Sequence, residues 1–157
     1  GSQKTRSADV ASIPVSAFGY NQQAGTVVVE ATAPTGNTNN VNYASFGNAD
    51  LNDFIRLWTW EGATSYVRWT GTNFDVTMPF VAGAAMTVAG SYAQDNYNLA
   101  VDGTAGSPDT AGAQTLDAHL LIIGSKTGAT EHLNGHIKSI QYYPRRLTNA
   151  QLQELTS

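Results

Sequence analysis

The sequence has no cysteine among its 157 residues, which excludes disulfide bonds, thiolate metal sites and thiol nucleophiles. Charged residues make up only 13% of the chain, and the formal net charge is −4. Domains that bind nucleic acid normally carry a basic patch, so this acidic balance argues against DNA or RNA as a partner. The longest apolar stretch, residues 80–89, is interrupted by Gly83 and Thr87 and is far shorter than the roughly 20 residues that span a bilayer. We therefore expect no membrane insertion.

Hydrophobic residues are plentiful, at 41% of the chain, which is enough for one core in a chain of this length. Residues 1–12 show no periodicity, and we expect them to be a tag remnant and a linker. The dipeptide Gly1-Ser2 is typical of a cleaved expression tag, so we expect the natural protein to be longer. The remaining residues, 13–157, are expected to form one domain.

Apolar residues alternate with polar ones in short runs that are rich in Val, Ile, Thr, Tyr and Trp and are separated by Gly, Asn, Asp and Pro. The clearest runs are residues 25–31, 44–47, 53–60, 65–70, 74–78, 86–93, 97–101, 119–124 and 135–143. This pattern predicts an all-β fold, a two-sheet antiparallel β-sandwich or jelly roll. Both faces of the run 53–60 carry apolar or aromatic residues, so we expect it to be a central strand.

A short helix is predicted at the C-terminal end of the sequence. Thr148 and Gln151 have the spacing of a capping box, and three leucines supply an apolar stripe, namely Leu147, Leu152 and Leu155. Residues 33–42 and 102–118 are small, polar and rich in turn formers, so we expect surface loops there. In the second of these, Asp102-Gly103 is a dipeptide that accepts positive φ in a tight turn.

Three stretches together are similar to laminin G-like or concanavalin A-like domains near the C-termini of bacteriophage tail fibres, tail spikes and other virion surface proteins. The most specific is residues 133–156, LNGHIKSIQYYPRRLTNAQLQELT. Residues 6–13 (RSADVASI) running into residues 22–31 (QQAGTVVVEA) resemble the entry to that domain, and residues 92–103 (YAQDNYNLAVDG) resemble its strand, turn and strand.

This resemblance implies a non-catalytic recognition module on the surface of a phage virion, which would act outside the host cell. Its partner would be a bacterial surface glycan such as capsule, lipopolysaccharide or teichoic acid. The parent fibre would contact other virion proteins and could be a homotrimer. A structural role in the virion, as a capsid decoration, fibre cap or trimerisation domain, is the alternative, because both roles use Trp, Tyr and Arg at their contact surfaces.

Sugar sites combine flat aromatic faces with planar polar groups, and one part of the sequence supplies both. If residues 53–60 and 65–70 form a hairpin, five side chains make the leading ligand site: Arg56, Trp58, Trp60, Tyr66 and Arg68. We expect this surface to be flat and partly exposed. The competing interpretation is that the tryptophans belong to the core and the arginines cap the sheet, since buried aromatics are common in sandwiches.

Two loops rich in side-chain oxygen are candidates for a Ca²⁺ site. Asp50, Asn52 and Asp53 form one, and Asp95 belongs to the other. The spacing is not that of an EF-hand, and Asn and Asp are also ordinary turn residues. We therefore expect no required cofactor, with Ca²⁺ as the ion to test.

A catalytic role was tested against the requirements of glycoside hydrolysis. Retaining enzymes need two carboxylates about 5 Å apart, often from alternating positions of one strand. The glutamates Glu30, Glu61, Glu131 and Glu154 are each isolated, and no strand carries acids in that pattern. The sequence therefore favours binding over catalysis.

Overall fold

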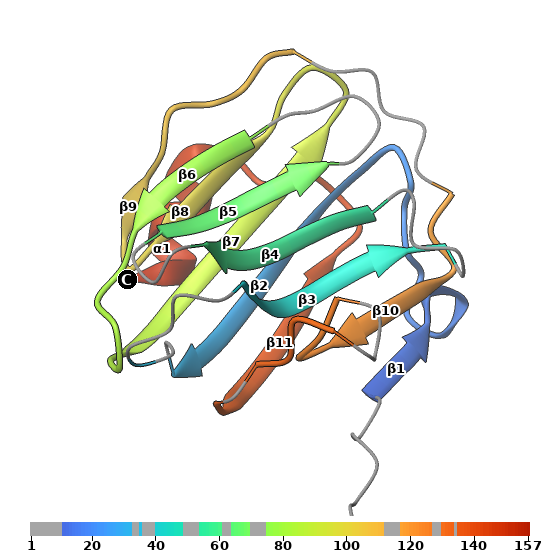
Figure 1. Ribbon diagram of the computed structural model, residues 1–157. Coiled ribbons are helices and arrows are strands. Elements are labelled where there is room, and N and C mark those ends of the chain that lie inside the picture. The colour runs from blue at the N-terminus through green and yellow to red at the C-terminus, as the bar shows by residue number, and fades with distance from the viewer. Residues whose placement is uncertain are drawn as a thin grey trace, which may run out of the picture.

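The computed structural model describes residues 11–32, 35, 40–48, 54–60, 64–69, 75–111, 117–126, 130–133 and 135–157. These residues form two antiparallel sheets that lie face to face, with one helix outside them (Figure 1). The front sheet in Figure 1 has six described strands, in the spatial order β1 (Ala11–Pro14), β10 (Leu120–Ile123), β3 (Val41–Gly47), β4 (Phe54–Trp60), β5 (Thr64–Trp69) and β6 (Asp75–Pro79).

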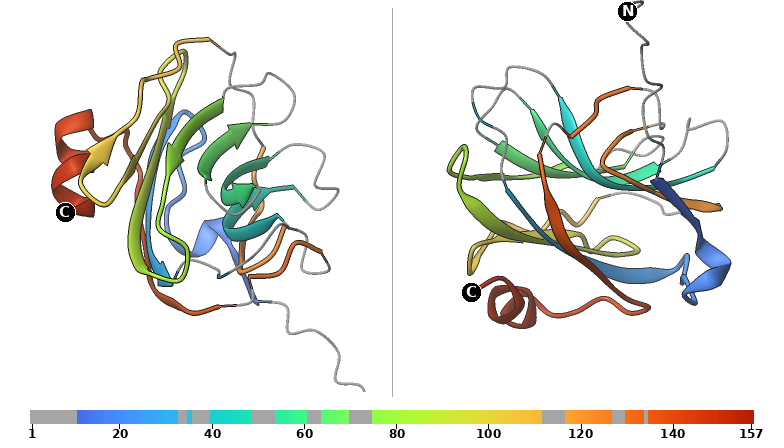
Figure 2. Two further views of the ribbon diagram at one scale, coloured as in Figure 1. Left: turned by 60° about the vertical axis from the view of Figure 1, so that its left-hand side comes forward. Right: turned by 90° about the horizontal axis from the view of Figure 1, so that it is seen from below.

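The second sheet has five strands within the described part of the chain. In spatial order they are β11 (Ile137–Tyr143), β2 (Ala24–Thr32), β7 (Ala85–Ala93), β8 (Asn98–Val101) and β9 (Thr104–Ala105). A 3₁₀ turn, η1 (Val15–Ala17), follows β1, and helix α1 (Asn149–Thr156) ends the chain. The left view of Figure 2 shows α1 on the outer side of the five-stranded sheet.

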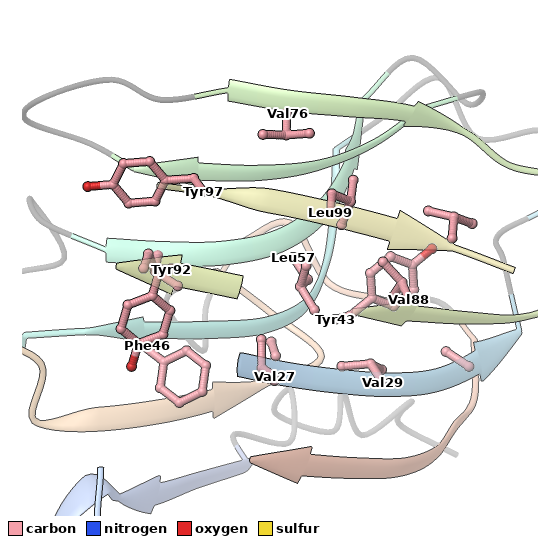
Figure 3. Packing of buried hydrophobic residues seen from close by; sticks show 14 of the residues in the cluster. Val27, Val29, Tyr43, Phe46, Leu57, Val76, Val88, Tyr92, Tyr97 and Leu99 are labelled. Carbon is pink, nitrogen blue, oxygen red and sulfur yellow. The ribbon is translucent and has the colours of Figure 1, made fainter. Parts of the chain in front are cut away.

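Alternation along the strands explains why the two sheets pack together. In β2, Val27 and Val29 point into the space between the sheets, where they meet Val88 of β7 and Leu57 of β4 (Figure 3). The intervening Val28 points outward and packs under α1 against Leu152. Side chains at successive strand positions face opposite sides, so one apolar run serves both the sandwich core and the helix dock.

The predicted sandwich and its strands are confirmed. Each of the nine apolar runs overlaps a strand, and β4 lies between β3 and β5 with its residues 54–59 buried on both faces. The sheet begins at Ala11, so residues 11 and 12 belong to the sandwich and not to a linker. The predicted loop 102–118 contains the short strand β9. Residues 1–10 lie outside the described residues.

The helix begins where the sequence predicts. Thr148 caps it, because its hydroxyl accepts a hydrogen bond from the Gln151 amide at 3.3 Å while the Gln151 side chain accepts one from the Thr148 amide at 2.9 Å. Two leucines, Leu147 and Leu152, bury its inner face against Val28 and Ala89. Within the described residues no helix is long and apolar enough to cross a bilayer.

A cluster of aromatic rings fills one end of the space between the sheets. Tyr20 stacks on Phe46 and Tyr142, with ring centroids 5.4 and 5.6 Å apart. The Tyr92 hydroxyl donates to the Asn21 carbonyl at 2.8 Å and lies 3.0 Å from the Tyr142 hydroxyl. The phenols of Tyr92 and Tyr142 thus obtain hydrogen-bond partners, as most polar groups in a low-dielectric core do.

Buried tyrosines, in this cluster and at Tyr43, make the fold sensitive to alkali. Burial raises the pKa of Tyr20, Tyr43, Tyr92 and Tyr142 above the ordinary value, because the interior disfavours a phenolate. Unfolded tyrosine ionises near pH 10, so above about pH 10 the unfolded state releases protons that the folded state keeps, and stability falls. We expect urea midpoints to be constant from pH 8 to about 9 and to decline from about pH 10 upward, with a shallower decline in Tyr92→Phe. An equal decline in both proteins would contradict this assignment.

Candidate functional site

The segment after β10, described at residues 124–126 and 130–133, lies over the outer face of the six-stranded sheet. The Gly124 amide donates to the Tyr43 carbonyl at 3.0 Å, and the Leu133 amide donates to the Gly124 carbonyl at 2.7 Å. The Asn42 amide donates to the Glu131 carbonyl at 3.2 Å. These bonds hold the segment against β3, and they place Glu131, at a positive φ of 53°, above β4.

Three cationic or amide groups converge on the Glu131 carboxylate. The Arg56 guanidinium donates to Oε2 at 2.6 Å and the Asn42 side-chain amide donates to the same oxygen at 2.8 Å. The Lys126 ammonium reaches Oε1 at 3.3 Å. We call Asn42, Arg56, Lys126 and Glu131 the Glu131 cluster. Charge-assisted hydrogen bonds of this kind are about twice as strong as neutral ones, so the carboxylate is held firmly.

Aromatic rings form the base of the Glu131 cluster. The Arg56 guanidinium carbon lies 3.3 Å from the centroid of the Trp58 ring and 4.9 Å from that of Phe54. The Lys126 ammonium lies 5.3 Å from the Phe54 centroid. Cations over ring faces are attracted by the ring quadrupole, so both cations are positioned by stacking as well as by Glu131.

Exposure within the cluster decreases toward the sheet. The side chains of Lys126 and Glu131 are 28% and 19% exposed, whereas the Arg56 side chain is 5% exposed and Trp58 is 1% exposed. Lys126 and Glu131 are therefore the groups that a ligand would meet first. Arg56 and Trp58 support them from below.

The predicted exposure of Arg56 and Trp58 is thus wrong. Both residues lie on the outer face of the sheet, as the alternation of β4 requires, but neighbouring groups, including Glu131 and Lys126, cover them. The strand pairing is as predicted, with Arg56 opposite Arg68 and Trp58 opposite Tyr66. The side chains of Trp60, Tyr66 and Arg68 lie outside the described part of the structure. Their role in ligand binding stays a prediction.

Glu131 is the residue that sequence reasoning missed. It stands 75 positions after Arg56 in the chain and has no acidic or aromatic neighbour in sequence that would mark it. Only the return of the segment onto β3 brings it to Arg56. No local pattern in the sequence therefore predicts the contact between Arg56 and Glu131.

The two predicted Ca²⁺ loops have different outcomes. Asp50, Asn52 and Asp53 lie outside the described residues. Asp95 is exposed at the tip of the turn between β7 and β8, where its φ is 52° and Ala93 and Asn96 exchange backbone hydrogen bonds at 3.1 Å. Asp tolerates this backbone conformation better than most residues, which accounts for Asp95 by turn geometry. Among the described residues, no three His, Asp or Glu side chains group as metal ligands would.

Comparison with known proteins identifies the fold. The CBM40 of the Ruminococcus gnavus IT-sialidase, in a structure bound to α2,3-sialyllactose, superposes with a TM-score of 0.77 and 16% identity, over 98% of this chain and 96% of that chain. Domains LG4-5 of the mouse laminin α1 chain give a TM-score of 0.67 and 17% identity, over 89% of this chain and 40% of that one. The chain has a laminin G-like, concanavalin A-like β-sandwich fold.

A third similar structure comes from a heptameric protein. The heptameric SAP-like pentraxin from Limulus polyphemus matches the laminin G-like domain with a TM-score of 0.64 and 12% identity, over 88% of this chain and 73% of that chain. No protein-family model and no curated protein matches the sequence. A shared fold does not carry a shared function, so function must be argued from the Glu131 cluster.

The Glu131 cluster has the hydrogen-bonding capacity that a polyhydroxylated ligand requires. A carboxylate offers about four lone-pair positions and an ammonium offers three donors, so Glu131 and Lys126 retain capacity beyond their mutual contact. Glu131 can accept from hydroxyls while Lys126 donates to hydroxyl or acidic oxygens. On a laminin G-like domain, this places a mixed polar site on the outer face of the six-stranded sheet.

Proposed function

We propose that this domain is a non-catalytic glycan-binding module whose ligand contacts the Glu131 cluster. The observation that carries the proposal is the convergence of Arg56, Lys126 and Asn42 on one partly exposed carboxylate above the Trp58 and Phe54 rings. Such a site is preorganised, because Arg56 and the rings fix the polar groups before a ligand arrives. The similar carbohydrate-binding module in complex with sialyllactose supports the same class of function.

The biological setting that we propose is the surface of a phage virion. The resemblance of residues 133–156 and of the entry and turn segments to phage virion domains supports this setting. The ligand would then be a bacterial capsule, lipopolysaccharide or teichoic acid. A virion presents many copies of such a module, and a homotrimeric fibre would hold them close together. Avidity then multiplies a weak single-site affinity by roughly 10² to 10⁴.

The test is binding of the fluorescently labelled domain to immobilised capsule, lipopolysaccharide, teichoic acid and sialyllactose, with and without a calcium chelator. We expect saturable binding to one glycan class and a loss of about tenfold in Lys126→Ala, the size of one charge-assisted hydrogen bond. Arg145→Ala is the matched control, because it removes an exposed positive charge from the turn between β11 and α1, away from the Glu131 cluster. Sensitivity to the chelator would identify Ca²⁺ as part of the site.

Two results would count against this function. A folded domain that binds none of these glycans would favour the structural virion role, and a protein partner would then be sought. Equal affinities of Lys126→Ala and Arg145→Ala for a bound glycan would move the site away from the Glu131 cluster.

A further inference from the structure

A cavity lies on the outer face of the five-stranded sheet, on the opposite side of the molecule from the Glu131 cluster. Helix α1 covers only part of this face, where Val28, Ala89 and Ala100 pack under Leu152. Beyond its C-terminal end the face remains open, and a cavity of about 390 Å³ is found there. Its lining comes from β2, β7 and β11, from the turn between β8 and β9, and from the end of α1.

One wall of this cavity, the Asp102–Gly103 turn, is fixed by hydrogen bonds to two different elements, β7 and α1. The Asp102 carboxylate accepts from the Thr87 amide of β7 at 2.8 Å. The Gly103 amide donates to the Thr156 hydroxyl of α1 at 3.0 Å, and the Gln153 side chain donates to the Gly103 carbonyl at 3.4 Å. The turn holds Asp102 and Gly103 at φ values of 45° and 77°, as the Asp-Gly dipeptide predicts. The cavity is therefore shaped before any ligand binds.

A charged pair forms the opposite rim of the cavity. The Lys138 ammonium pairs with the Glu30 carboxylate across β11 and β2, and this hydrogen bond lowers the pKa of the Glu30 carboxyl. Lys138 is 81% exposed, so its remaining donors point to solvent or to an occupant. The lining also contains Asp102 and the imidazole of His136, so two carboxylates face one ammonium, and the formal charge with neutral histidine is negative.

The lining of the cavity combines small apolar groups with polar ones. Ala85 is exposed on β7, and the hydroxyl residues Thr32 and Thr87 share its face of the sheet, whereas Ala31 and Met86 line the cavity although their side chains belong to the core between the sheets. A sugar ring also combines the two kinds of group, with C–H groups on one face and hydroxyls around its edge. Carboxylates and threonine hydroxyls accept from sugar hydroxyls, and the ammonium and the threonines donate to them. The volume lies within the range of about 300–1,000 Å³ that is usual for small-molecule sites.

From this arrangement we propose that the cavity between Glu30, Asp102 and Lys138 binds one neutral sugar unit. The net negative charge disfavours a glycan unit that carries a carboxylate or phosphate, which separates this site from the Glu131 cluster with its two cations. The domain then holds a glycan at two faces with different charge preferences. This proposal is independent of the proposed function, because it concerns other residues on the other sheet.

The test is a titration of the whole chain followed by amide NMR. The probes are glucose, galactose, mannose and N-acetylglucosamine, with glucuronate as the anionic and glucosamine as the cationic counterpart. We expect at least one neutral sugar to shift the amides of Thr87, Asp102 and Lys138 with a Kd in the millimolar range, and glucuronate to shift none of them. Absence of shifts at these amides for every neutral sugar up to about 100 mM would overturn the proposal.

Substitutions separate binding from folding. Ala85 is exposed on β7, so Ala85→Trp fills the cavity without entering the core and should abolish the shifts. Glu30→Gln and Asp102→Asn keep side-chain shape and an acceptor, and each should weaken neutral-sugar binding about tenfold. Glu154→Gln on α1, away from the cavity, is the matched control and should bind as the parent does.

Tighter binding of glucosamine than of any neutral sugar, or unchanged binding in Ala85→Trp, would contradict the assignment. Lys126→Ala should leave these shifts intact even if the Glu131 cluster binds no glycan.

Discussion

We expect Gly25→Ala to lower the free energy of unfolding by about 3 kcal/mol, the upper part of the usual cost of overpacking a core. Gly25 of β2 pairs with Tyr92 of β7, and its α-carbon lies directly against the aromatic cluster. A β-carbon at this position would stand 2.5 Å from Tyr92 Cζ and 2.7 Å from the Tyr142 hydroxyl oxygen, with the Tyr92 hydroxyl nearer still. Real β-carbons do not approach atoms so closely, so the rings or the strand must shift.

The rings cannot give way easily. The Tyr92 and Tyr142 hydroxyls bond to each other and to the Asn21 backbone, and both rings pack against Tyr20. Any shift that relieves the contact also breaks these hydrogen bonds in a buried site, where an unmade bond costs about 1–3 kcal/mol.

Urea denaturation of two control variants tests this explanation. In Gly106→Ala the new β-carbon meets the Met78 sulfur at 2.9 Å and Val76 Cγ1 at 3.0 Å. The sulfur belongs to a flexible side chain and the valine contact is less close than those at Gly25, so the loss should be smaller. In Gly25→Ala Tyr92→Phe the nearest atom is removed, so the combined loss should be less than the sum of the two single losses. Additive losses, or equal losses in Gly25→Ala and Gly106→Ala, would contradict the steric account.

The sequence allowed the sandwich to be predicted because its strands carry their own signals. Alternation marks β2, β7 and β11, and apolar residues on both faces mark β4 as central. The capping box at Thr148 and Gln151 is equally local. These features depend on residues that are close in the chain, so one sequence suffices to find them.

Two strands escaped prediction because they lack that signal. β1 has four residues, all exposed, and β9 has only two, so neither is long enough to show a clear alternation. Both are held at sheet edges by backbone pairing with β10 and β8. Backbone hydrogen bonds to a neighbour do not depend on side-chain pattern, and for that reason the sequence does not reveal them.

Only the part of the candidate site that lies on β4, Arg56 and Trp58, could be predicted from the sequence. The β4 alternation put Arg56 and Trp58 on one face, and the hairpin register with β5 followed from the turn between them. What lies above that face depends on residues 124–126 and 130–133, which are held by backbone bonds to β3 at Asn42 and Tyr43. The predicted exposure of Arg56 is therefore wrong, because residues far away in the sequence cover it and no periodic pattern marks such a contact.

The ion pair between Arg56 and Glu131 leads to the second large effect, a loss of about 3 kcal/mol of stability in Glu131→Ala. The Arg56 side chain is 5% exposed and its guanidinium lies 2.6 Å from the Glu131 carboxylate. Removing one partner of a buried pair leaves the other charge in a low-dielectric site without the group that offsets its desolvation. The stacking of Arg56 on Trp58 supplies less than this carboxylate does, because cation–π contacts are worth about 0.5–2 kcal/mol.

Chemical denaturation of three further variants separates this charge effect from lost packing. Lys126→Ala removes a cation that is 28% exposed, so it should cost about 1 kcal/mol or less. Arg56→Met Glu131→Gln removes both charges and keeps most of the volume, so it should be more stable than Glu131→Gln alone. If Glu131→Gln equals the double variant, or if Glu131→Ala costs no more than Lys126→Ala, the pair does not hold the covering segment. If the stability losses follow the expected order, Arg56 is a positioning residue. It fixes the Glu131 carboxylate, which Lys126 and a glycan would share.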